Sequence, residues 1–282
     1  MERRIHKYLK KNSKVSQHVA KLLGGMLAGL TFCDGAWLHR PQVSPFHTKT
    51  GRDTSIGSAL NYVPKEYWSS FLLPPEEYSY VLLDYEQQEP VIAAHLAGCN
   101  ALLDIYSAGD IYEHLACLLD DPRLGRPQVK RLLIAQLYGI SEKRLVEDFG
   151  VPSSLVRSWV NKVKEATNPI SSYLDRIGRT IQQNKVATSL DWRYAIDVKD
   201  PFNSLRNWSI QATGADIMRR ACLGFDAAKI PLLLTNHDSF LIQVKTSNIE
   251  EEVEKAITLL EVASADVLSG FKLKTKVEMT LS

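Results

Sequence analysis

Val81-Leu82-Leu83-Asp84-Tyr85 is an apolar run that ends beside an acid, and Leu232-Leu233-Leu234-Thr235-Asn236-His237-Asp238 repeats the pattern before Phe240-Leu241-Ile242. The first run is typical of a buried strand, and the second of a hairpin with Asp238 in its turn. An aspartate at a strand end and another in a hairpin turn can lie side by side. Because close carboxylates repel each other unless a cation neutralises them, the pair indicates a divalent metal site.

A segment with helical spacing lies between the two aspartates. Arg126, Lys130, Ile134 and Tyr138 are four residues apart, so they form one stripe on an α-helix that begins near Pro127. The cationic end of the stripe fits a triphosphate, and its aromatic end fits a base or a sugar. Alone, the segment also fits an amphipathic surface helix. Its position between two metal-binding candidates favours phosphoryl transfer from a nucleotide.

Composition sets only wide limits on function. The 282 residues suffice for one large or two small domains with a substantial core. A net charge of +2 is too small to indicate nucleic-acid binding by itself. The first fourteen residues, however, carry six lysines and arginines against Glu2 alone. This run fits either an arm on a phosphate backbone or a solvated tail.

Cysteine spacing and hydropathy exclude some classes of protein. The four cysteines lie far apart without a CxxC pair, which argues against a structural zinc site. The apolar stretch 19–32 is interrupted by Lys21 and by glycines, so it is too short for a membrane span. It also lacks a convincing signal-peptide cleavage site. We therefore expect a soluble, intracellular protein without a membrane partner.

The remaining patterns predict strands on both sides of a helical block. The expected elements are a helix at 15–32, a strand at 79–85, a helix at 89–98, helices through most of 100–190, a strand pair at 188–198, a helix at 208–224, a hairpin at 231–244, a helix at 249–268 and a strand at 272–280. This order predicts an α+β sheet domain that carries a helical insertion.

Several of these segments, in chain order, resemble motifs of family A DNA polymerases, the bacterial polymerase I type. The matching segments are Thr50-Gly51-Arg52; Asp84-Tyr85-Glu86-Gln87-Gln88-Glu89 with Ala94-His95-Leu96, similar to Asp-Tyr-Ser-Gln-Ile-Glu and Ala-His-Leu; Asp110-Ile111-Tyr112, similar to Asp-Ile-His; Arg126, Lys130, Tyr138 and Gly139; Asn207 with Gln211-Ala-Thr-Gly-Ala-Asp216; and His237-Asp238-Ser239, similar to His-Asp-Glu. Joint occurrence in order carries the resemblance, which runs from about residue 34 to residue 282.

The resemblance implies a right-hand polymerase architecture, with an antiparallel palm sheet, a helical fingers insertion and no full thumb. Residues 1–33 would be a basic helical thumb stump, 34–105 and 188–282 the two parts of the palm, and 106–187 the fingers. No acidic exonuclease motif is present in the sequence. We therefore expect low processivity or a protein partner that supplies processivity or a thumb.

The resemblance also implies roles around the metal site. Asp84 and Asp238, assisted by the Tyr85 carbonyl, would hold two Mg²⁺ ions, for which Mn²⁺ can substitute. Lys130 and Arg126 would bind the triphosphate of the incoming deoxynucleotide (dNTP).

Other matched residues would contact the nascent pair and the primer-template DNA. Tyr138, followed by Gly139, would pack beside the nascent pair. Glu89 would exclude a 2′-hydroxyl, although Ile134 replaces the aromatic residue that the family has at that position. The residues expected to contact primer and template without reading sequence are Arg52, Asn207, Gln211 and His237.

Two departures leave alternatives open. Ser239 replaces the third motif's acid, and Glu86 adds a charge next to Asp84. The main hypothesis is a template-directed DNA polymerase. The alternatives are a polymerase with relaxed template or sugar choice, and a non-catalytic nucleic-acid-binding or scaffold protein on the same fold.

Overall fold

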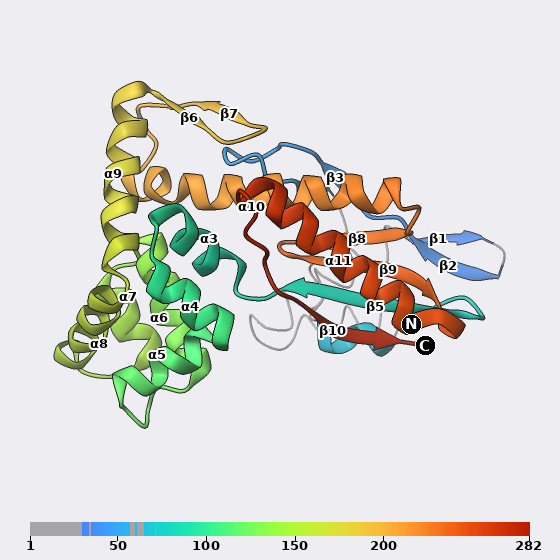
Figure 1. Ribbon diagram of the computed structural model, residues 1–282, viewed down its shortest axis with the longest axis horizontal. Coiled ribbons are helices and arrows are strands. Elements are labelled where there is room, and N and C mark those ends of the chain that lie inside the picture. The colour runs from blue at the N-terminus through green and yellow to red at the C-terminus, as the bar shows by residue number, and fades with distance from the viewer. Residues whose placement is uncertain (1–29, 34, 57–59, 61–64, 71) are drawn as a thin grey trace, which may run out of the picture.

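A four-stranded antiparallel sheet forms the centre of the computed structural model, which describes residues 30–33, 35–56, 60, 65–70 and 72–282 (Figure 1). Its spatial order is β10-β5-β9-β8. The strands are β5 (Tyr78–Tyr85), β8 (Leu232–Asn236), β9 (Ser239–Lys245) and β10 (Thr275–Leu281). The predicted strand at 79–85, the hairpin at 231–244 and the strand near 272–280 are thus confirmed.

Two long helices pack against this sheet and against each other, α10 (Phe202–Ala227) and α11 (Ile249–Val267). Tyr85, Phe240 and Phe225 meet in the core between them, with ring centroids 5.9 Å apart for the first pair and 5.4 Å apart for the second. The Tyr85 hydroxyl donates to the carbonyl of Leu260 at 2.6 Å. Buried aromatic rings of this kind contribute a large share of core stability. Helix α10 begins six residues before the predicted start at Trp208.

The predicted helical block is confirmed. It consists of α3 (Gln88–Ala97), α4 (Asn100–Ala108), α5 (Ile111–Leu119), α6 (Arg126–Tyr138), α7 (Glu142–Phe149), α8 (Ser153–Ala166) and α9 (Asn168–Asn184). Figure 1 shows α5 to α8 gathered at the end of the molecule away from β1 and β2. Among the described helices, each is too short or too polar to cross a lipid bilayer.

Within the described residues, three further antiparallel strand pairs lie outside this sheet. They are β1 (Leu30–Cys33) with β2 (Ala36–His39), β3 (Gln42–Ser44) with β4 (Thr54–Ile56), and β6 (Val186–Thr188) with β7 (Arg193–Ala195). The last confirms the strand pair predicted at 188–198. A 3₁₀ helix, η2, covers Lys65–Ser70.

The helix predicted at 15–32 is wrong for residues 30–32, and its remainder lies outside the described residues. Residues 30–33 form β1, so this part of the predicted 1–33 helical segment is a strand. A short apolar run fits either structure by its spacing alone. Asp34-Gly35 is a strong hairpin signal that favours strands over a helix in the residues next to it.

The loop 48–52 is attached to α10 through a partly buried ion pair. Asp216, 1% exposed, pairs with Arg219 one turn later on the same helix. Arg219 Nη1 donates to the Gly51 carbonyl at 2.8 Å, and Asp216 Oδ2 accepts from the Leu190 amide at 3.0 Å. One carboxylate therefore connects the helix to two loops.

Replacing Asp216 with alanine should destabilise the protein by about 2 kcal/mol, because it removes a buried carboxylate that pairs with the partly buried Arg219 guanidinium and accepts from the Leu190 amide. Urea unfolding measures this loss. Asp226→Ala is the matched control, since Asp226 lies near the end of the same helix and pairs with Lys229 at the same spacing but is 85% exposed. The control should change the free energy of unfolding by less than about 0.5 kcal/mol. Equal losses in the two variants would contradict the assignment.

Candidate active site

The sheet register brings Asp84 and Asp238 together. Asp84 lies opposite Ser239 in the β5–β9 ladder. The backbone N–H of Tyr85 donates to the carbonyl of Asp238 at 3.1 Å, which fixes the hairpin turn against the end of β5. Burial first, and then the charge of Asp238, raise the pKa of Asp84 to about 7. Burial likewise raises the pKa of Asp238. Two close acids that resist ionisation are a site for a cation.

The turn between β8 and β9 positions Asp238. His237 is exposed and has a φ of +54°, a left-handed conformation that few residues adopt without cost. Ser239, fully buried, donates its hydroxyl to the Asn236 carbonyl at 2.9 Å. The residue that stands in place of an acid therefore stabilises the turn and has its hydroxyl proton already committed.

The donor set fits a divalent cation, and Mg²⁺ prefers such carboxylate oxygens. Asp84 and Asp238 would hold it. Tyr85 can contribute only its backbone, since its side chain lies in the core. Among the described residues, no group of three or more His, Cys, Asp and Glu side chains is arranged to hold a metal ion. Further ligands would therefore be backbone, water or substrate oxygens.

Two residues near Asp84 have no counterpart among the sequence predictions. Lys65 Nζ lies 3.7 Å from Asp84 Oδ2 and forms an ion pair with Glu278 of β10. The charge of Glu278 contributes to the raised pKa of Asp84, whereas Lys65 and Lys276 lower it. The sequence carries no local signal for this cluster, because its members come from three distant segments.

The predicted stripe lies along helix α6, and its last two residues are less exposed than its first two. Arg126 lies at its first position, 44% exposed, and donates through Nε and Nη2 to Asp110 Oδ2 at 3.0 and 2.7 Å. Asp110 also caps α5 by accepting from two backbone amides. Lys130 is exposed and forms no ion pair within the described part of the chain. Ile134 and Tyr138 are half-buried and pack against the core.

Glu89 joins three separate segments. It lies in the first turn of α3 and accepts from the Tyr138 hydroxyl at 2.8 and 3.0 Å and from Arg52 Nη2 at 2.7 Å. Burial and Glu89 raise the pKa of Tyr138 to about 12, so the phenol remains a donor. Gly139 ends α6 with a φ of +65°, and an added Cβ would lie 2.7 Å from Asn203. Glycine is needed at this position for both reasons.

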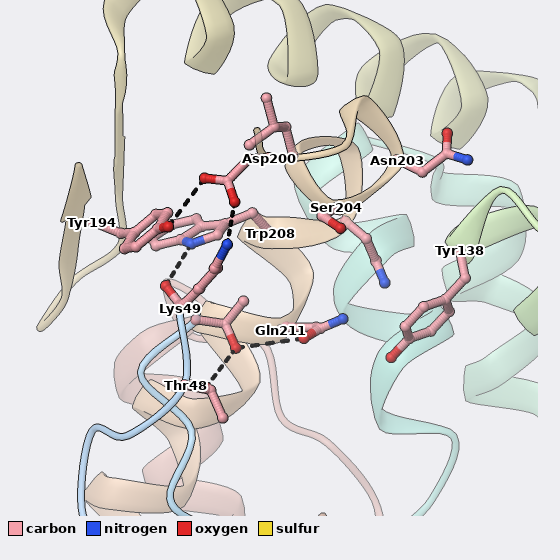
Figure 2. Close-up of a pocket in the computed structure, with 12 residues that line it drawn as sticks. Thr48, Lys49, Tyr138, Tyr194, Asp200, Asn203, Ser204, Trp208 and Gln211 are labelled. Atoms are coloured by element: carbon pink, nitrogen blue, oxygen red, sulfur yellow. Dashed lines mark hydrogen bonds and ion pairs between the residues drawn. The ribbon is translucent and has the colours of Figure 1, made fainter. Parts of the chain in front are cut away.

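A cavity of about 400 Å³ lies between the loop 48–50, the start of α10 and Tyr138 (Figure 2). Figure 2 shows Gln211 and Tyr138 on facing sides of it. Asn207 also lines the cavity and is 2% exposed, and neither amide atom has a hydrogen-bond partner within the described structure. Because buried amides are almost always bonded, this one points to a polar ligand.

A second cavity, of about 290 Å³, lies beside the aspartate hairpin. Arg52 and His237 line it, together with Asn236, Arg219 and Cys222. The segment 48–55 contributes to both cavities. The four residues predicted to contact nucleic acid are thus divided between two cavities on either side of this segment: Arg52 and His237 in one, Asn207 and Gln211 in the other.

Comparisons with known proteins agree with this arrangement. DNA polymerase I of Caldicellulosiruptor bescii is 26% identical over 249 residues, which are 78% of this chain and 29% of that protein. DNA polymerase I of Aquifex aeolicus is 26% identical over 76% of this chain and 40% of that protein. The chain thus spans well under half the length of these relatives.

A solved structure has the same fold. The POL domain of Pol1 from M. smegmatis, in complex with DNA primer-template and dNTP, matches with a TM-score of 0.81. It is 19% identical, over 94% of this chain and 51% of that one. The predicted fold class, an α+β polymerase architecture, is therefore confirmed. The sequence model of DNA polymerase family A matches residues 39–282. The chain belongs to DNA polymerase family A.

Proposed function

We propose that the chain provides the palm and fingers of a template-directed DNA polymerase. It would add deoxynucleotides to a primer 3′ end by two-metal phosphoryl transfer. The partly buried pair formed by Asp84 and Asp238 carries this proposal, because such a pair is hard to explain without bound cations. The polymerase relatives and the primer-template complex of the structural neighbour support it.

The proposed chemistry divides between the metals and the chain. Mg²⁺ held by Asp84 and Asp238, with the Tyr85 carbonyl, would activate the primer 3′-hydroxyl and neutralise the leaving pyrophosphate. Lys130, unpaired within the described structure, and Arg126, fixed by Asp110, would bind the triphosphate.

The two cavities would hold the DNA. Arg52 and His237 lie nearest the aspartate hairpin and would contact the primer end. Asn207 and Gln211 would contact the template side, and the amide of Asn207, unpaired in the described structure, supplies two N–H donors and a carbonyl acceptor. Backbone and minor-groove contacts of this kind position DNA without reading its sequence.

Sugar choice would depend on Glu89. Its carboxylate is held by Arg52 and Tyr138, so it presents a fixed wall rather than a mobile side chain. Ile134, half-buried on the same helix as Tyr138, adds a smaller surface than an aromatic ring would. Glu89, more than Ile134, would therefore be the residue that favours deoxynucleotides.

Asp84→Asn and Asp238→Asn should each lower primer extension by about 10³-fold, because a metal supplies several kcal/mol of transition-state stabilisation. Extension of a labelled primer on a DNA template with Mg²⁺ measures this. Asp104→Asn, an exposed acid on α4, is the control and should retain full activity.

Wild-type protein that binds primer-template DNA but shows no extension with Mg²⁺ or Mn²⁺ would favour the non-catalytic alternative. The replacement of an acid by Ser239 is the observation that makes that alternative worth testing. Extension that is equal in wild type and both aspartate variants would indicate a contaminating polymerase.

The affinity of the site for a metal should fall as the pH is lowered. Protonated Asp84 cannot hold a cation, and the pKa of this carboxyl is about 7. Affinity for Mn²⁺ should therefore be constant above that pH and fall by up to about tenfold for each pH unit below it. Calorimetric titration at several pH values tests this. A constant affinity down to about pH 5 would contradict it.

Glu89→Ala should raise the use of ribonucleotides relative to deoxyribonucleotides by at least about tenfold, since removing a wall admits the 2′-hydroxyl. Single-nucleotide incorporation kinetics with each sugar measure the ratio. Glu113→Ala removes an exposed acid from α5 and serves as the matched control. An unchanged ratio in Glu89→Ala would assign sugar choice to other residues.

A further inference from the structure

Lys65 lies between two carboxylates at the edge of the proposed metal site. Its ammonium forms a short ion pair with Glu278 and a longer one, at 3.7 Å, with Asp84 Oδ2. All three side chains are partly shielded from water, with exposed fractions of 29%, 33% and 18% respectively. In such surroundings charges interact more strongly than at an open surface.

The position of Glu278 comes from an irregularity in β10. Lys276 is opposite Asp84 in the β5–β10 ladder, and the register shifts between Val277 and Met279. Glu278 falls at this bulge and has no partner residue in β5. Bulges re-aim side chains at sheet edges beside functional sites. Here the bulge places a carboxylate where it can hold the Lys65 ammonium.

A lysine this close to Asp84 competes with a divalent cation for the same carboxylate. Asp84 and Asp238 receive no help in metal binding from an acid at position 239, because this position holds Ser239, whose hydroxyl bonds within the hairpin. The nearer carboxylate of Glu278 instead retains the ammonium. Glu278 therefore sets how much of Asp84 is available to a metal.

We propose that Glu278 is a positioning residue that takes the shorter ion pair with Lys65 and so weakens the hold of this ammonium on Asp84, which leaves Asp84 able to bind a divalent cation. This inference rests on the proposed polymerase function of the site. Glu278 acts through Lys65 and is not itself a ligand. In agreement, no third carboxylate in the described part of the chain is grouped with the two aspartates as a metal ligand.

Mn²⁺ binding to the whole chain without DNA, measured by electron paramagnetic resonance of the free ion, tests this directly. Glu278→Gln should weaken binding by about tenfold, because Lys65 then turns to Asp84. Lys65→Met should strengthen binding by several-fold. In the Lys65→Met background, Glu278→Gln should weaken binding by no more than about threefold, the effect of a lost charge alone.

Lys276→Met is the matched control for charge. Lys276 also acts on Asp84 electrostatically, yet forms no ion pair with Glu278 in the described structure. In this background Glu278→Gln should keep its full tenfold effect. A loss that is equal in the presence and absence of Lys65 would overturn the inference, and a larger loss without Lys65 would make Glu278 a ligand.

The same measurement separates this inference from the proposed function. If wild type does not bind Mn²⁺, or if Asp238→Asn binds it as well as wild type, the metal site itself is wrong. If binding needs Asp238 but the Glu278 effect is independent of Lys65, only the positioning role fails. Thermal unfolding of each variant checks that the sheet is intact. Should Glu278→Gln unfold, Glu278→Asp gives the same comparison, because its shorter carboxylate also releases Lys65.

Discussion

The repulsion between two partly buried carboxylates is the constraint on which the rest of this structure depends. Asp84 is fixed by ladders on both sides of β5, and Asp238 is fixed by a tight turn whose backbone bonds to the end of that strand. These backbone contacts keep the two acids next to each other. Without a cation, burial raises the pKa of both acids. The aromatic core beneath them, built around Tyr85 and Phe240, offsets this cost. The pair of acids thus destabilises the metal-free protein locally, but it is already in place to bind a metal.

The segment 48–52 shows how a loop becomes a rigid part of such a site. It is fixed from outside by side chains that bond to its backbone. The indoles of Trp192 and Trp208 donate to the Lys49 carbonyl at 3.1 and 2.8 Å, and Arg219 donates to the Gly51 carbonyl. Arg52, which follows directly, can then hold Glu89 at a fixed place. Preorganisation of this kind means that little ordering is needed when a ligand binds.

Local sequence patterns made many of the helices and strands predictable. Contacts that leave no local pattern in the sequence could not be predicted. The strand ending at Tyr85 and the helix between Pro127 and Gly139 follow from an apolar run and from residues that start or stop helices. The proximity of the two aspartates followed from a strand and a hairpin. By contrast, the ion pair of Lys65 with Glu278 joins segments about two hundred residues apart, and no periodicity marks either residue. Long-range electrostatic contacts of this kind are determined by tertiary structure alone.

The serine at position 239 shifts the electrostatic balance of the whole site. Position 239 is fully buried and lies opposite Asp84, so an acid there would add a third charge to a pair that already resists ionisation. Serine avoids that repulsion and closes the turn through the Asn236 carbonyl. The metal-free hairpin is therefore easier to form, but cation binding loses one source of attraction. With less attraction for the cation, metal affinity depends more on the competition between Lys65 and the metal for Asp84. The Glu278 carboxylate, which restrains Lys65, therefore matters more here than it would beside an acid at position 239.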